Sequence, residues 1–184
     1  MIGSFIRRLL GEGRGTLAVE FALATPILAG LVLSGIEVTR YVVLNQKIER
    51  ATVSMADLVS QAESLAEGDL ANLFAAAAFV MMPYDVAAEG RVVVSSIGAS
   101  GGNPAQVNWR RVFGAGAGAG AFGAEGEAAS LPAGFVVRDG ESVIVAEVYY
   151  DFQPIFFDSL ADPANLYSYA VFRPRFSALN TVEP

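Results

Sequence analysis

The sequence of 184 residues lacks cysteine and histidine entirely, and Lys47 is its only lysine. Without a thiol or an imidazole the chain cannot form a Ser-His-Asp or Cys-His catalytic arrangement, nor a zinc site built from those ligands. Lys47 is not accompanied by a serine in a strained turn, so a Ser-Lys pair is not expected. Some carboxylates lie close together in the sequence, but none of these pairs has the spacing of a calcium-binding loop. We therefore expect no enzymatic activity, no cofactor and no metal site.

The absence of cysteine also excludes disulfide bonds, so stability must come from core packing and from helices. Basic residues are scarce as well, because from Thr16 onward the chain carries nine Lys and Arg against eighteen Asp and Glu. Nucleic-acid binding depends on clustered basic side chains. The basic pair of the distal part, Arg110-Arg111, is expected to occupy solvated strand positions. We therefore expect no nucleic acid among the partners.

Long apolar runs are missing except for one, GTLAVEFALATPILAGLVLSGI, which extends from Gly15 to Ile36 and contains a single charge, Glu20. As a helix, residues 16–36 would be about 30 Å long, which matches the hydrocarbon thickness of a bilayer. We predict one transmembrane helix over 16–36, in contact with lipid. A carboxylate inside hydrocarbon costs about 2–3 kcal/mol, so Glu20 is expected to have a partner.

Three arginines, Arg7, Arg8 and Arg14, precede the apolar run. Basic residues beside a transmembrane helix stay on the cytoplasmic side. This pattern predicts a cytoplasmic N-terminus and a main part on the opposite side, which in a bacterium is the periplasm.

The residues around the start of the apolar run form a recognisable group: upstream arginines, then Gly15, then Glu20 as the fifth residue after it, followed by Phe21. This group resembles the processing site of type IV prepilins, which implies cleavage between Gly15 and Thr16 and makes residues 1–15 a basic leader peptide. The wider stretch VEFALATPILAGLVLSGIEVTRYV, with Pro26 midway and Gly35-Ile36-Glu37 at its exit, resembles the N-terminal signature of TadE-like proteins of tight-adherence pilus systems. The segments SVIVAEVYYDFQPIF and Arg173-Pro174-Arg175 resemble that family more weakly.

The resemblance implies a minor pilin or pseudopilin of the inner membrane, cut by a prepilin peptidase. Its implied partners are other pilins or pseudopilins and the inner-membrane assembly platform, and the resemblance is also compatible with incorporation into the extracellular pilus. Glu20 and Phe21 would then set the register between subunits. Three alternatives stay open: an uncleaved membrane-anchored periplasmic adaptor, a pseudopilin of a related secretion system, and a secretory signal peptide cut after Ala22-Leu23-Ala24.

Beyond the membrane, residues 37–66 are expected to continue the helix, because apolar residues recur at steps of three and four. The stripe consists of Tyr41, Leu44, Ile48, Ala51, Met55, Leu58, Ala62 and Leu65. This stripe either packs on the globular part of the chain or joins a helix bundle. Different parts of the helix can also do each. Glu67-Gly68-Asp69 should end this helix, with Gly68 as the stop and Asp69 capping a second helix from Leu70 to about Met82.

From Arg91 the apolar period changes to that of strands. RVVVSSI and QVNWRRVF predict a hairpin with Val107, Trp109 and Phe113 on one face. SVIVAEVYYDF predicts a third strand with two alternating faces, and a last strand is expected near 169–176. The Gly/Ala-rich tract 114–130 is predicted to be a mobile surface loop without packing. The expected fold class is α+β and pilin-like: residues 67–184 form a globular domain with about four mostly antiparallel strands on the long helix.

Overall fold

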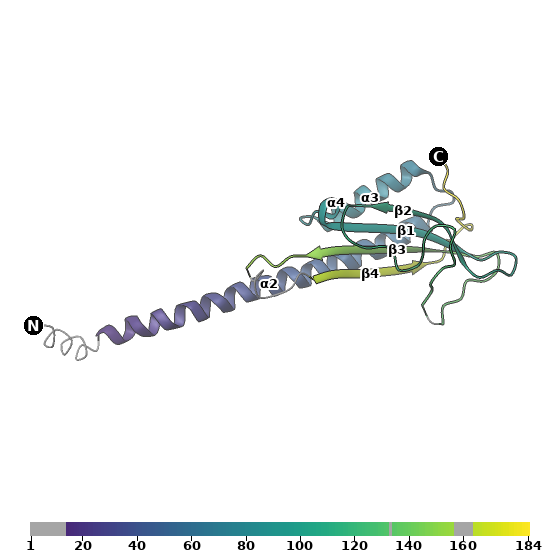
Figure 1. Ribbon diagram of the computed structural model, residues 1–184. Helices are drawn as coiled ribbons and strands as arrows, with labels where there is room; N and C mark the ends of the chain where they lie inside the picture. Colours follow the sequence, from purple (N-terminus) through teal and green to yellow (C-terminus); the bar gives the residue numbers. More distant parts are fainter. Residues whose placement is uncertain (1–13, 133, 157–163) are drawn as a thin grey trace, which may run out of the picture.

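The computed structural model describes residues 14–132, 134–156 and 164–184, and it is dominated by one helix, α2 (Arg14–Ser60) (Figure 1). The C-terminal half of α2 packs against strands β3 and β4 and helix α3, whereas its N-terminal half projects alone. We call α2 residues 17–36 the free half and the described residues from 61 onward the head. The predicted α+β class, with a long helix carrying an antiparallel sheet, is confirmed.

Helix α2 ends at Ser60, six residues before the expected end. The Ser60 hydroxyl donates to the Asp57 carbonyl at 2.7 Å, and the Ser60 carbonyl accepts from the Arg175 N–H at 2.9 Å. These bonds satisfy groups that a helix end leaves open. The next helix, α3 (Glu67–Met81), begins earlier than predicted. Gly68 and Asp69 lie inside it, and Asp69 accepts from the Ala66 N–H at 3.1 Å, so the expectation that Gly68 stops the first helix is wrong.

A short helix α4 (Val86–Glu89) leads into a sheet of four strands: β1 (Gly90–Gly98), β2 (Gln106–Phe113), β3 (Ser142–Phe152) and β4 (Ala164–Phe172). Their order is β2-β1-β3-β4 and every neighbouring pair is antiparallel. The first three strands agree with the prediction. The fourth begins before residue 169 and ends before Pro174, because its pairing with β3 closes at Phe172 opposite Ile144.

The faces of β2 differ from the simple alternation expected for it. Ser96 pairs with Trp109 and Ile97 pairs with Val107, so Asn108 is an extra residue in a β-bulge. As a result Trp109 belongs to the core between sheet and helices, whereas Val107 belongs to a second core on the other face. The expectation that Val107 and Trp109 share a face is therefore wrong.

The main core lies between the sheet and the helices. From α2 it takes Leu44, Ile48, Ala51 and Met55, and from β3 it takes Ile144, Ala146 and Val148. The predicted alternation of β3 is thus confirmed, because Val143 and Val145 belong to the opposite core. Of the expected helix stripe, Leu58 is exposed and Val59 is buried in its place.

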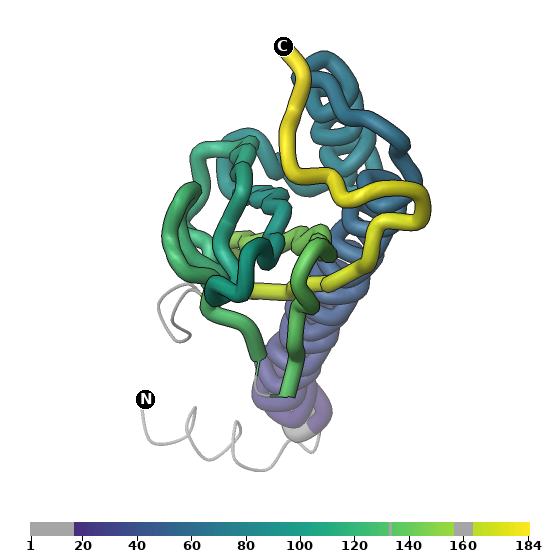
Figure 2. Tube along the Cα trace, turned by 90° about the vertical axis from the view of Figure 1, so that its right-hand side faces the viewer, coloured from purple at the N-terminus to yellow at the C-terminus, as the bar shows by residue number. Residues whose placement is uncertain are grey.

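The Gly/Ala-rich tract covers the face of the sheet that is turned away from α2 (Figure 2). Phe122 is 4% exposed in the second core, and Gly126 and Ala129 bond to the backbone carbonyls of Val107 and Ala105. A Cβ on Gly118 would meet the Tyr149 ring at 2.6 Å. The expectation of an unpacked loop is wrong, since glycine here permits a close approach to the sheet.

The two adjacent arginines of β2 hold this arrangement in place rather than standing free in solvent. Arg110 donates to the carbonyls of Ala119 and Gly123, and Arg111 pairs with Glu67 on α3 at 2.5 Å. The expectation of solvated arginines at these two positions is therefore wrong. Arg110 fixes the tract to the outer face of the sheet, and Arg111 fixes β2 to α3.

Candidate functional site

The free half of α2 presents apolar side chains that no part of the head covers. Among the described residues, α2 contains the one segment that is long and apolar enough to cross a membrane. The side chains that are more than half exposed there are Leu17, Val19, Phe21, Leu23, Ile27, Leu28, Leu31 and Val32. A continuous apolar surface of this size marks contact with lipid or with another protein.

The hydroxyl side chains of the free half are satisfied within the helix itself. Thr25 donates to the Phe21 carbonyl at 2.6 Å and Ser34 donates to the Gly30 carbonyl at 2.7 Å. In hydrocarbon a polar group needs such an internal partner, because water is absent. Pro26 lies inside α2 and supplies no N–H. Helix α2 nevertheless continues through Pro26. The hydroxyl groups of Thr25 and Ser34 require no partner outside the helix.

The residues predicted for processing and register lie at the beginning of α2. The helix starts at Arg14, so Gly15 and Thr16 are in its first turn, while Arg7 and Arg8 lie outside the described residues. Glu20 is exposed, and none of the described side chains forms an ion pair with it. The free half thus carries one carboxylate, next to the 72% exposed Phe21, among uncharged side chains.

A second carboxylate, Glu37, follows the last residue of the apolar run and is buried. Its Oε2 accepts hydrogen bonds from the backbone N–H of Ile155 at 3.0 Å and of Phe156 at 3.1 Å. Its Oε1 pairs with Arg40 at 2.7 Å. Glu37 therefore ties the segment after β3 to α2 at the point where the free half ends. Sequence reasoning missed this role, and the signals available were the family-like segments around Glu37 and around Ile155.

The surroundings of Glu37 favour its ionised form. Burial raises the pKa of this carboxyl group, but the N–H groups of Phe156 and Ile155 and the charge of Arg40 together outweigh burial. The pKa of Glu37 therefore lies below its ordinary value of 4.5. A carboxylate that receives several hydrogen bonds keeps its charge in this way.

Aromatic residues surround Arg40 at the junction, by which we mean the place where Glu37 and Arg40 of α2 meet Ile155 and Phe156. The Arg40 guanidinium lies over the Phe152 ring at 5.5 Å from its centre, and the Tyr41 ring meets Phe152 edge-on, also at 5.5 Å. The Tyr84 hydroxyl donates to the Arg40 carbonyl at 3.1 Å. Tyr41 is thus half-exposed beside the junction, whereas Leu44 and Ile48 further along α2 are fully buried in the core of the head.

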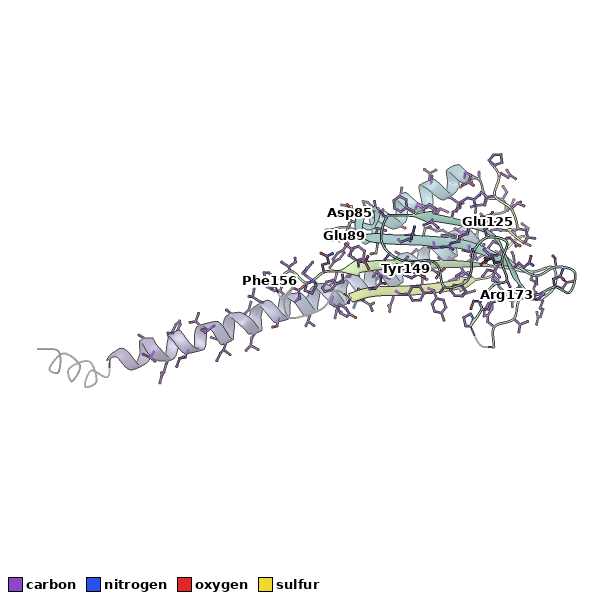
Figure 3. The ribbon with its side chains drawn as sticks, viewed as in Figure 1. Asp85, Glu89, Glu125, Tyr149, Phe156 and Arg173 are labelled. Carbon is purple, nitrogen blue, oxygen red and sulfur yellow. The ribbon has the colours of Figure 1, made fainter. Side chains whose placement is uncertain are left out.

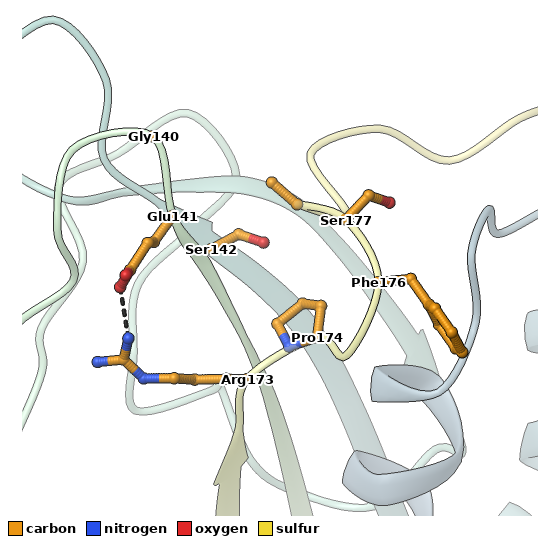
Figure 4. Close-up of a pocket in the computed structure, with 8 residues that line it drawn as sticks. Gly140, Glu141, Ser142, Arg173, Pro174, Phe176 and Ser177 are labelled. Carbon is orange, nitrogen blue, oxygen red and sulfur yellow. Dashed lines mark hydrogen bonds and ion pairs between the residues drawn. The ribbon is translucent and has the colours of Figure 1, made fainter.

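The far end of the molecule holds a shallow pocket of about 230 Å³ beside β3 and β4 (Figure 4). Arg173 pairs with Glu141 on its rim, and the Ser142 hydroxyl accepts from the Leu179 N–H. Arg175 pairs with Asp57 of α2 at 2.9 Å. The Arg173-Pro174-Arg175 segment therefore fastens the end of β4 to the sheet and to α2, and its charges are engaged in that task.

A buried carboxylate, Glu147, lies on the outer face of the sheet. It accepts from the Tyr149 hydroxyl at 2.8 Å, the Tyr167 hydroxyl at 3.0 Å and the Ala121 N–H at 2.7 Å. Burial and the Glu147 charge raise the pKa of Tyr149 to about 12, and they raise that of Tyr167 as well. These phenols stay protonated and serve as donors, so the cluster satisfies a buried charge and holds the Gly/Ala-rich tract.

Comparison with known proteins gives one finding for the long helix. No curated protein and no solved structure matches the chain. Residues 15–55, which include Glu20, Pro26 and Glu37, match the sequence model of the TadE-like protein family, and the chain therefore carries a TadE-like domain in its long helix.

Proposed function

We propose that the chain is a minor pilin or pseudopilin that acts in the assembly or initiation of a tight-adherence pilus. The observation that carries the proposal is the uncovered apolar half of α2, which continues without a break into a packed head. The TadE-like match over residues 15–55 supports the same proposal. In the bilayer the free half anchors the chain, and within a pilus it packs among the corresponding helices of other subunits.

A prepilin peptidase cuts between Gly15 and Thr16 in this proposal, and the new α-amino group of Thr16 becomes the partner of Glu20. The amine of one subunit meets Glu20 of its neighbour, which fixes the axial offset of the two helices. A charge pair in low dielectric is costly unless it is matched, so it can specify register even where it adds little stability. The remaining partners are other pilins and the inner-membrane assembly platform.

The test is the N-terminus of the accumulated protein. In cells that contain the peptidase, intact-mass measurement and N-terminal sequencing should find Thr16 as the first residue, and a Gly15→Leu variant should retain the leader. Retention of Met1 in the parent protein would favour the alternative, an uncleaved periplasmic adaptor. A pseudopilin of a related secretion system would give the same cleavage and would be recognised by the machine with which it crosslinks.

The proposed orientation places the head outside the cytoplasm, with the N-terminus inside. A reporter that is active only in the periplasm, fused after Pro184, should be active. The same fusion made with a cytoplasm-specific reporter should be silent. The reverse pattern would overturn the orientation and, with it, the pilus proposal.

A further inference from the structure

We propose that residues 155–156 form a second membrane contact, which rests on the bilayer surface beside the helix that crosses it. This inference depends on the proposed anchoring of the free half of α2. Its starting point is the position of the segment: both residues are bonded to Glu37, the residue that follows the 16–36 span. Figure 3 shows Phe156 at the base of the head, alongside α2. A helix that crosses the bilayer over 16–36 therefore brings this segment to the lipid headgroups.

The two side chains have the chemistry of an interfacial contact. Ile155 is 61% exposed and Phe156 is 46% exposed, although the segment is fixed to α2. Apolar and aromatic side chains are favoured at the boundary between headgroups and acyl chains. The exposed side chains of Val38 and Val42 lie on α2 just beyond Glu37 and add to the same apolar belt, as does Tyr41.

The backbone N–H groups of this segment already have hydrogen-bond partners, as a site with little water requires. An unpaired N–H group is costly to remove from water. The N–H groups of Ile155 and Phe156 both donate to the Glu37 carboxylate, so approach to lipid leaves neither of them unpaired. The Glu37 carboxylate thus both pairs these two N–H groups and holds the segment against α2.

Charge favours lipid as the occupant of this surface. The chain as a whole carries a net charge of −7, which would repel anionic headgroups. Within residues 36–43 and 153–156, however, the charged side chains are Glu37 and Arg40, and these form an ion pair with each other. The surface formed by these two segments is therefore neutral and apolar, and the nearby Glu89, which lines the same pocket as Ile155, accepts a hydrogen bond from the Tyr150 hydroxyl. Contact at two points, the helix and this segment, would fix the tilt and rotation of the head above the membrane.

Site-directed spin labelling can test the contact, because a chain without cysteine gives no background. The full chain would be reconstituted in vesicles of phosphatidylethanolamine and phosphatidylglycerol with a label at Phe156→Cys. The matched control is Phe176→Cys, also an exposed phenylalanine. Its neighbour Arg175 pairs with Asp57 of α2. Asp57 is twenty residues beyond Glu37 on the helix, so Phe176 should lie about 30 Å further from the bilayer than Phe156. A label at Leu28→Cys reports the anchoring itself.

Labels at Leu28 and Phe156 should collide more often with oxygen, which concentrates in lipid, than with a water-soluble nickel chelate. The label at Phe176 should show the reverse. If Leu28 behaves like Phe176, the membrane anchoring of the proposed function fails. If Leu28 is embedded while both Phe156→Cys and a second variant, Ile155→Cys, behave like Phe176, the second contact is overturned. Spin–spin broadening at position 156 would also overturn it, because it would place a second copy of the chain there.

Discussion

The Glu37 carboxylate accepts a hydrogen bond from the Phe156 backbone N–H at 3.1 Å, across a separation of 119 residues. This bond joins α2, at the residue that follows the free half, to the segment after strand β3. Because Glu37 also holds Ile155 and Arg40, one side chain couples the base of the head to the helix. The junction is therefore a place where a single substitution should loosen the head without touching its core.

Glu37→Gln should lower the stability of the head at neutral pH, since an amide oxygen is a weaker acceptor than a carboxylate and does not pair with Arg40 as an ion. The pKa of Glu37 is lower in the folded chain than its ordinary value of 4.5. Its contribution is therefore present above pH 4.5 and is lost as the pH falls through the folded-state pKa. Thermal unfolding in detergent should show a difference between parent and variant at pH 7 that shrinks below pH 4.5.

The matched control for this change is Glu49→Gln, an exposed carboxylate on the same helix. It should alter the melting temperature little at either pH. A difference between parent and Glu37→Gln that is equally large at pH 7 and at pH 3.5 would contradict the assigned charge state.

Ile48→Ala and Leu58→Ala should differ sharply, although both positions belong to the apolar stripe predicted for the helix. Ile48 is fully buried in the main core, whereas Leu58 is 45% exposed. Removing a buried aliphatic side chain costs about 2–5 kcal/mol, and a surface change costs about 0.5 kcal/mol or less. Denaturant unfolding of the detergent-solubilised chain measures both. Equal losses would mean that Leu58 is covered by another molecule under these conditions.

Some of the head could be read from the sequence because local patterns determine it. The alternation in β3 identified both of its faces, since each strand residue points opposite to its neighbour. Alternation failed in β2 because one extra residue, Asn108, reverses the faces. The start of α3 was misplaced because Gly68 is compatible with a helix interior at moderate cost, and Asp69 caps from within the first turn rather than before it.

For the candidate site too, features set by neighbouring residues could be predicted from the sequence, and contacts between distant segments could not. The apolar run, Glu20 and the arginines before it are contiguous in the sequence, so a membrane helix and a resemblance to pilins could be inferred from them. The bond between Glu37 and Phe156 depends on how the sheet folds back on α2, and no local pattern specifies it. The packing of the Gly/Ala-rich tract was missed for a similar reason. Its anchors, Arg110 and Glu147, are on strands outside it.

Gly118→Ala should destabilise the head, contrary to what an unpacked surface loop over 114–130 would predict. The new Cβ would lie 2.6 Å from the Tyr149 ring, and Gly118 has a φ of +138°. Overpacking of this kind costs about 1–3 kcal/mol. Gly126→Ala is the matched control, because Gly126 also has a positive φ, +82°, but a Cβ there meets nothing within 4 Å. Calorimetry should show a larger loss for Gly118→Ala, and equal losses would mean that the tract is not packed on Tyr149.

Glu20→Gln should separate processing from assembly. The variant keeps the size of the side chain and removes its charge, so it cannot form an ion pair with the α-amino group of a neighbouring Thr16. Membrane insertion should be unchanged or slightly favoured, because a neutral amide costs less than a carboxylate in hydrocarbon. Cleavage at Thr16 should also continue. Pilus incorporation, measured by crosslinking and by counting pili, should fall well below that of the parent.

Val19→Ala, a change beside Glu20 that leaves the charge in place, is the matched control, since Val19 is 59% exposed on the same turn of α2. It should process and assemble as the parent does if register depends on charge. Loss of cleavage in Glu20→Gln would make Glu20 a determinant of the peptidase site instead. Normal piliation by Glu20→Gln would show that its carboxylate sets no register, and the solitary charge would then be a tolerated polar residue at the membrane edge.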